Sequence, residues 1–184
     1  MQIYEEQIDI SDYAVVADLD VEKSPDGVVI DGSALVHSLV PRRSKTFEEY
    51  ADHEVIPKIN LYSEKYQRTD IVFDVYKASS LKAEARSRRG QGFRRKVTGK
   101  TKLPSSWYSF LRDDSNKTEL FEYLADRIIS LCESNLVVVT KKENCHSNRD
   151  VDLALLNQCN HEEADSRIFC MLYMLFLNNI WYVC

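Results

Sequence analysis

Acidic residues follow two apolar segments of the sequence, and two more open a predicted helix. Asp31 and Asp74 each come directly after a short run of Val, Ile or Phe, and Glu163 and Asp165 lie in the first turn of the helix. Carboxylate oxygens are the ligands that Mg²⁺ and Mn²⁺ prefer, and two such ions can hydrolyse a phosphodiester by stabilising its attacking and leaving oxygens. The pattern therefore favours a Mg²⁺ or Mn²⁺ site whose catalytic ligands are these four carboxylates.

Each of these acids also has a plainer interpretation. An Asp after a strand often makes a turn, and Glu or Asp in the first turn of a helix is favoured by capping and by the helix dipole alone. The combination is what favours the metal site. Three acidic positions in one α/β pattern, two after strands and one at a helix start, are harder to explain singly.

A second chemical feature is a basic segment, residues 81–102, which holds nine Lys or Arg residues and one acid although the whole chain has a formal net charge of −5. A basic strip on an acidic body attracts polyanions at one place and repels them elsewhere. Phosphate contacts of this kind weaken with salt. The alternatives are a solvated arm or a nuclear-localisation signal. The predicted partner is nucleic acid, with DNA favoured over RNA, and the predicted contacts are Lys82, Arg86, Arg88, Arg89, Arg94, Arg95, Lys96, Lys100 and Lys102.

Three aromatic residues, Trp107, Tyr108 and Phe110, follow the basic segment. Exposed rings at this place could stack on unpaired bases, which would give a site that tolerates single strands. Packing in the core is the favoured interpretation, because Trp and Phe near a proline more often fill a core.

Apolar runs alternate with amphipathic segments along the chain, and this order predicts the elements. Capping-box patterns open the helices, and Pro57 predicts a kink in the first of them. The polar stretch 141–149 is expected to be a loop. The predicted strands are 28–30, 71–73 and 136–140, with a short one at 180–183; the predicted helices are 46–66, 116–131 and 160–177, opened by Thr46, Asn116 and Asn160.

The β-α-β-α-β-α order defines the expected fold class. Strands spaced by helices form a parallel sheet flanked by helices, and ligands gather at the carboxyl ends of its strands. The length of 184 residues suits one domain, since domains typically hold roughly 100–200 residues. We expect an acidic, weakly ordered lead-in over 1–27 and an α/β domain over 28–184.

Cysteine usage predicts the compartment. The five cysteines are odd in number and irregularly spaced, and no basic flank followed by an apolar run opens the sequence. We therefore expect an intracellular protein, nuclear or cytoplasmic, and not a secreted one. The apolar stretch 168–184 is interrupted by two Asn residues and is shorter than the roughly 20 residues of a membrane span, so no membrane partner is expected. The sequence leaves the oligomeric state undetermined.

Three longer strings carry a resemblance to a known fold: VVIDGSALVH, IVFDVYKASSLKAEARSRRG and HEEADSR. They resemble, in order and spacing, the PIN-like nuclease fold in its flap-endonuclease and XPG-related branch. The resemblance implies a three-layer α/β/α core, an Asp after each of the first two strands, a Lys/Arg-rich arch and a later E-x-D pair; Asp31, Asp74, Glu163 and Asp165 match these acids. The strings are also similar to animal proteins that carry an HEEAD motif and are linked to mobile elements.

The sequence departs from the nuclease pattern at its C-terminal end. In that family the E-x-D helix is followed by a strand ending in a D-x-D pair, whereas no acidic residue follows Asp165 here. The resemblance therefore implies a core that is incomplete and C-terminally truncated; a short strand in place of the acidic one and a mis-joined coding sequence are alternatives. Without the pair the second metal loses ligands, and a severe loss of activity is expected.

Two functions remain open on these grounds. One is a metal-dependent, structure-selective nuclease core, inactive if the missing pair is essential. The other is a non-catalytic nucleic-acid-binding or scaffold module derived from a mobile-element nuclease. Both predict binding that salt weakens.

Overall fold

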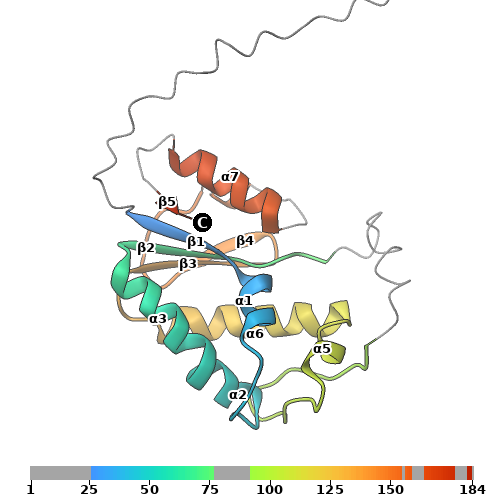
Figure 1. Cartoon of the computed structure of the whole chain (residues 1–184). Coiled ribbons are helices and arrows are strands. Elements are labelled where there is room, and N and C mark those ends of the chain that lie inside the picture. Colours follow the sequence, from blue (N-terminus) through green and yellow to red (C-terminus); the bar gives the residue numbers. More distant parts are fainter. Residues whose placement is uncertain (1–25, 77–91, 155, 159–163, 177–181, 184) are drawn as a thin grey trace, which may run out of the picture.

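A five-stranded sheet in the order β4-β3-β2-β1-β5 forms the centre of the computed structural model, which describes residues 26–76, 92–154, 156–158, 164–176 and 182–183 (Figure 1). β1 pairs in parallel with β2 and β5, and β3 with β2, whereas β4 is antiparallel to β3. The chain is therefore an α/β protein with a mostly parallel open sheet. The strands are β1 (Gly27–Asp31), β2 (Arg68–Val72), β3 (Leu136–Lys141), β4 (Asn144–Ser147) and β5 (Tyr182–Val183).

β3 is buried on both faces of the sheet, which explains its run of consecutive valines. In β3 the three consecutive residues Val137, Val138 and Val139 are all fully buried. Val137 and Val139 belong to the larger core on one face, and Val138 belongs to the smaller core on the other. Crossover helices cover both faces of such sheets, so the strands lose the alternation of polar and apolar residues.

Helices lie on opposite sides of the sheet, with α7 on one side and α1, α3 and α6 on the other (Figure 1). The side with α7 (Ala164–Phe176) also holds a short 3₁₀ turn, η3 (Leu156–Gln158), and the smaller core. The other side holds the larger core. Its helices are α1 (Gly32–Ser38), α2 (Phe47–Tyr50), the π-helix η2 (Ala51–Val55), α3 (Ile56–Lys65), α5 (Trp107–Phe110) and α6 (Asp114–Leu131).

The predicted helix at 46–66 is present as three consecutive segments, α2, η2 and α3. Thr46 caps it as predicted, since its hydroxyl accepts a hydrogen bond from the Glu49 N–H at 3.2 Å. Pro57 lacks an N–H, and its ring crowds a regular helix. The chain accommodates it with a π-turn in which the Ile56 N–H donates to the Ala51 carbonyl five residues back. The predicted kink is thus a widened turn just before the proline.

The start of α6 corrects one prediction. The helix begins at Asp114, and Asp113 caps it by accepting a hydrogen bond from the Asn116 N–H at 2.8 Å. Asn116, predicted to be the cap, is instead fully buried within the first turn. The prediction was wrong because a polar residue with distant partners has the same appearance in a sequence as a local cap.

The predicted loop at 141–149 is also wrong, because it contains β4. This strand forms a hairpin with β3, and Lys142 in the turn has a left-handed backbone with φ 55°. β4 is an edge strand in which Cys145 alone is buried. A strand with one solvated face and few apolar residues resembles a loop in the sequence.

The C-terminal elements agree with the sequence where the structure describes them. α7 lies within the predicted final helix, and its predicted cap Asn160 lies outside the described residues. Residues 1–25 of the predicted N-terminal lead-in also lie outside them. β5 falls within the predicted strand 180–183 and pairs Tyr182 and Val183 with the start of β1. None of the helices in the described part of the chain is long and apolar enough to cross a membrane.

Candidate functional site

The carboxyl ends of β1 and β2 bring the first two predicted acids to one edge of the sheet. Asp31 is the last residue of β1 and pairs in register with Val72, the last residue of β2. Asp74 follows two residues later. Parallel strands end at the same edge, which is where α/β proteins bind their ligands. We call this the carboxyl edge.

Asp31 also caps α1. Its Oδ1 oxygen accepts hydrogen bonds from the backbone N–H groups of Ser33 at 2.8 Å and Ala34 at 3.0 Å. The strand passes directly into the helix through Gly32, where an added Cβ would lie 2.4 Å from the Phe73 ring. Glycine is therefore required for the ends of β1 and β2 to approach so closely. Within the described residues no hydrogen bond reaches the second oxygen of Asp31, Oδ2.

Asp74 connects three parts of the fold. Its Oδ2 oxygen accepts hydrogen bonds from the hydroxyls of Ser33 at 2.6 Å and Tyr76 at 3.1 Å. Its Oδ1 oxygen accepts the backbone N–H of Ala164, the first residue of α7, at 2.7 Å. Ser33 thus contacts both acids, with its N–H on Asp31 and its hydroxyl on Asp74. A single carboxylate joins the end of β2 to helices on both faces of the sheet.

The hydroxyl of Tyr76 is a permanent donor to this carboxylate. Burial raises the pKa of Tyr76, and the adjacent negative charge of Asp74 raises it further. The ring is also covered by the Lys117 ammonium, which lies 4.0 Å from its centroid. Because the phenol stays protonated, it orients Asp74 and does not compete with it for protons.

The start of α7 lies at this edge, but the structure describes only one of the two acids predicted there. Asp165 is exposed in the first turn of α7. Glu163 lies outside the described residues. Among the residues that the structure does describe, no group of three or more His, Cys, Asp or Glu side chains is placed to hold a metal ion. Oxygen donors of Asp31 and Asp74 suit Mg²⁺ or Mn²⁺ in type, yet by themselves they are too few.

Arg167, one turn into α7, is a residue that the sequence prediction missed. Its side chain is almost fully buried, at 1% exposure, and its Nη1 donates to the backbone carbonyl of Lys142 in the β3–β4 turn. Ala164 and Arg167 therefore attach the first turn of α7 to the end of β2 and to this turn. The only sequence signal was an arginine near the start of an otherwise apolar helix.

A cavity of about 380 Å³ opens beside Asp74. Its wall includes Tyr76, Phe121 of α6 and the turn residues Lys142 and Asn144. The ion pair between Lys142 and Glu122 of α6, at 3.3 Å, crosses the same region. The cavity therefore joins a candidate catalytic carboxylate to a group of basic and acidic side chains on the β3–β4 turn.

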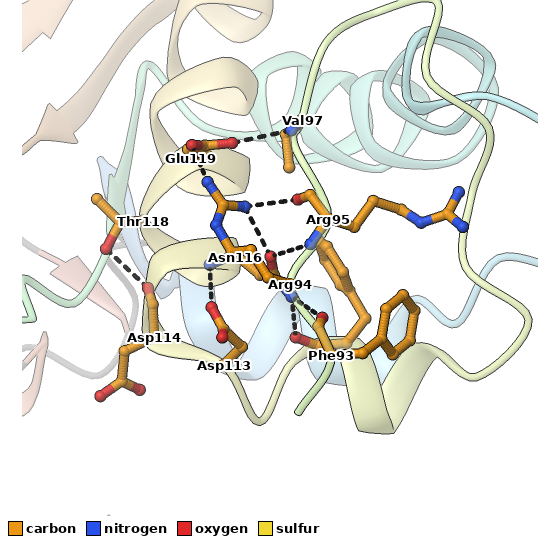
Figure 2. Close-up of polar contacts among 10 residues, drawn as sticks. Phe93, Arg94, Arg95, Val97, Asp113, Asp114, Asn116, Thr118 and Glu119 are labelled. Atoms are coloured by element: carbon orange, nitrogen blue, oxygen red, sulfur yellow. Dashed lines mark hydrogen bonds and ion pairs between the residues drawn. The ribbon is translucent and has the colours of Figure 1, made fainter. Parts of the chain in front are cut away.

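The described end of the basic segment is held against the first half of α6 (Figure 2). The Asn116 amide donates to the carbonyls of Phe93 and Phe110, and its oxygen accepts from the Arg94 side chain and the Arg95 N–H. Glu119 accepts from the Arg94 guanidinium and from a backbone N–H of the segment. The side chain of Arg94, a predicted nucleic-acid contact, is therefore already paired within the protein, and the backbone of Arg95 is held beside it.

Glu119 is ionised in this arrangement. Partial burial acts to raise its pKa, but the hydrogen bond from the Val97 N–H and the pairing with Arg94 outweigh burial, so that the pKa is lowered from its ordinary value of 4.5. Arg95 turns away from α6, with its guanidinium on the Lys102 carbonyl at 2.6 Å and 5.7 Å from the centroid of the Phe93 ring. Both guanidinium groups therefore have partners within the protein, while the Arg94 side chain is still 45% exposed.

Other basic residues of the segment remain available. The side chains of Lys96, Lys100 and Lys102 are exposed. The remaining four predicted contacts lie outside the described residues: Lys82, Arg86, Arg88 and Arg89.

The aromatic residues separate into two groups. Trp107 and Phe110 are buried in the larger core, as the packing interpretation predicts, and the Trp107 indole donates to the Val36 carbonyl at 3.2 Å. These two rings cannot stack on a base. Tyr108 is 59% exposed and is the one of the three that keeps a free face.

The chain was also compared with known proteins. No family model matches it, and neither a curated protein nor a solved structure gives a match.

Proposed function

We propose that the chain is a metal-dependent nuclease core of the PIN-like, flap-endonuclease type, with the three-layer α/β/α arrangement of that fold. The observation that carries the proposal is the meeting of Asp31 and Asp74 on Ser33, beside the first turn of α7. Two-metal phosphodiester hydrolysis needs carboxylates that converge on the metal ions, and acids from two strand ends and a helix start can supply them. The sequence resemblance supports the same assignment.

The proposed ligands are Asp31, Asp74, Asp165 and Glu163. When bound, Mg²⁺ or Mn²⁺ supplies a water that is easier to deprotonate and stabilises the charge on the leaving oxygen. Asp31 offers its Oδ2, because its Oδ1 is occupied by α1. Ser33 and Tyr76 fix the Asp74 carboxylate in place, as neighbouring hydrogen bonds commonly do for metal ligands.

Nucleic acid is the proposed substrate, held through phosphate contacts. Among the described basic residues of the segment, Lys96, Lys100 and Lys102 have exposed side chains, and these are the proposed contacts. Arg94 contributes less, because it is paired with Glu119. Affinity then depends on salt and little on base sequence.

A non-catalytic nucleic-acid-binding module is the second candidate. It is favoured because both acids have structural roles: Asp31 caps α1, and Asp74 accepts three hydrogen bonds. A fold that needs these carboxylates for stability would keep them after catalysis was lost. In this case binding persists and cleavage is absent.

Cleavage assays on flap, hairpin and single-stranded substrates with Mn²⁺ separate the two candidates. Asp31→Asn is the informative variant, because asparagine still caps a helix but lacks the anionic ligand. The matched control is Asp152→Asn, an exposed Asp whose carboxylate likewise accepts a backbone N–H two residues on, that of Ala154 at 2.9 Å. The nuclease proposal expects cleavage to fall by about 10²-fold or more in Asp31→Asn alone. Binding without metal-dependent cleavage in the wild type would leave the second candidate.

A further inference from the structure

Two arginines of this protein, Arg68 and Arg167, differ in how the Nε and Nη2 groups of the guanidinium are bonded. Arg68 donates from Nε to one oxygen of Asp70 at 2.8 Å and from Nη2 to the other at 3.1 Å. This paired edge matches two oxygens of one carboxylate or phosphate. In Arg167 the Nη1 group is bonded to the Lys142 carbonyl, while the Nε and Nη2 groups have no hydrogen-bond partner within the described structure.

The unpaired edge is unusual because it is buried. Arg167 is 1% exposed, so the solvent does not satisfy these donors. Leaving buried donors of a charged group without acceptors is costly, and such groups in native proteins generally have a ligand, water or ion as partner. The free edge of Arg167 has the same atoms that bind the Asp70 carboxylate in Arg68, and therefore suits an acceptor with two anionic oxygens.

The position of Arg167 indicates which acceptor. Arg167 lies one turn along α7 from Ala164, whose N–H binds Asp74, and residues three apart share a helix face. Its guanidinium reaches Lys142, which lines the cavity beside Asp74. Two of the acids that line this cavity already have other partners, since Glu122 pairs with Lys142 and Asp74 accepts three protein donors.

We propose that the Nε and Nη2 groups of Arg167 form a phosphate-binding point at the carboxyl edge. The proposal rests on the proposed function and deepens it, because it names a phosphate contact of the nucleic-acid backbone next to the candidate metal ligands. Nη1 of the same guanidinium is hydrogen-bonded to the β3–β4 turn, so a movement of this turn would free the guanidinium and let phosphate reach the buried Nε and Nη2 groups. Residues 142–144 are exposed and Lys142 has a strained backbone, which makes this turn the movable part.

Inorganic phosphate tests the proposal on the full chain without added metal. Thermal midpoints are measured against phosphate at constant ionic strength for the wild type, Arg167→Lys and the control Arg149→Lys. Arg149 also donates to a backbone carbonyl, that of Ser134, but from an exposed side chain. Lysine keeps the charge but carries its donors on a single nitrogen, so it lacks the paired edge. We expect the wild type and the control to rise by about 3–6 °C at about ten times the Kd, and Arg167→Lys to stay unchanged.

A second measurement covers the case in which Arg167→Lys does not fold. The side-chain Nε–H resonance of Arg167 in the wild type should shift as phosphate is added, whereas that of Arg149 should not. An unchanged Arg167 resonance, or an equal midpoint rise in all three proteins, would overturn the phosphate site. A wild type that cleaves with Mn²⁺ but ignores phosphate would refute only this inference. One that binds phosphate through Arg167 but never cleaves would refute only the nuclease.

Discussion

At the carboxyl edge, two acids predicted from the sequence are brought together by Ser33, and Asp31 keeps one oxygen free of hydrogen bonds from the described residues. In the basic segment, by contrast, Arg94 and Arg95 are fastened to α6 or to the segment itself. Both regions are rich in charge, but the fold leaves more chemistry available in the first. The difference shows that a charged residue in the sequence is not always free to bind a ligand, because its side chain can already be paired within the protein.

The largest expected effect comes from removing the central acceptor of the carboxyl edge. Asp74→Ala leaves the Ser33 and Tyr76 hydroxyls and the Ala164 N–H without their acceptor. We expect a loss of about 3–5 kcal/mol in the free energy of unfolding, because the lost bonds go to a charged, partly buried group. Urea unfolding followed by circular dichroism measures it. Asp152→Ala should cost less than about 1 kcal/mol, and an equally small cost for Asp74→Ala would contradict the network.

The basic segment should lose its attachment when Asn116 is truncated. Asn116→Ala removes both acceptor and donor groups that hold residues 93–95, and we expect a loss of about 2–4 kcal/mol. Hydrogen exchange should show faster exchange at the Arg95 amide, which donates to Asn116. The control is Asn144→Ala, at the exposed first residue of β4. Unchanged protection at Arg95 would show that Asn116 does not anchor the segment.

The exposed lysines of the basic segment should contribute more to nucleic-acid binding than Arg94 does. Replacing Lys96 and Lys100 together with Met should reduce the slope of log K against log salt by about 2. Arg94→Met should reduce it by less than about 1, because its guanidinium is already paired with Glu119. Fluorescence anisotropy with a single-stranded oligonucleotide measures both slopes. Equal reductions per residue would mean that Arg94 leaves Glu119 to bind phosphate.

The smallest expected effect is the pH dependence contributed by Glu119. Its pKa is lowered in the folded state relative to 4.5, so its stabilisation is present above that value and is lost as pH falls through the lower, folded value. Glu119→Gln should therefore be less stable than the wild type at neutral pH, with the difference shrinking in acid below about pH 4.5. Urea midpoints across this range test it. Because the Glu119 side chain is partly exposed, at 36%, added salt should reduce the difference. A difference that is constant with pH would exclude this role.

Much of the fold follows from local patterns. The strands at 28–30 and 136–140 are predicted because continuous Val and Ile runs have no stable place except a buried sheet, and the Thr46 cap is predicted because capping is decided within one turn. The strand predicted at 71–73 is β2, which begins three residues earlier, because its first half is polar and gives no apolar signal. The positions of Asp31 and Asp74 follow from these strands, since parallel strands end at one edge. β4 was missed because an exposed edge strand has little apolar signal, and its hairpin depends on pairing with β3.

The site itself shows what local patterns leave out. Ser33 and Tyr76 are close to the predicted acids in sequence, but their hydrogen bonds to Asp74 depend on how β1, β2 and α1 meet. Asn116 and Glu119 resemble a cap until the basic segment packs against them. Contacts between residues distant in the chain have no sequence signature of their own, because they form only when separate elements are packed together.

The amino-acid sequence by itself determined the α/β class, the edge at which the first two acids lie and the presence of a basic segment, because periodicity, capping and charge are local properties. The tertiary structure decided which charges are used: Asp74 as the acceptor for both helix layers, Arg94 as the partner of Glu119, and Arg167 as a buried guanidinium on the β3–β4 turn. Availability depends on burial and on partners tens of residues away, and these are settled only when the layers pack.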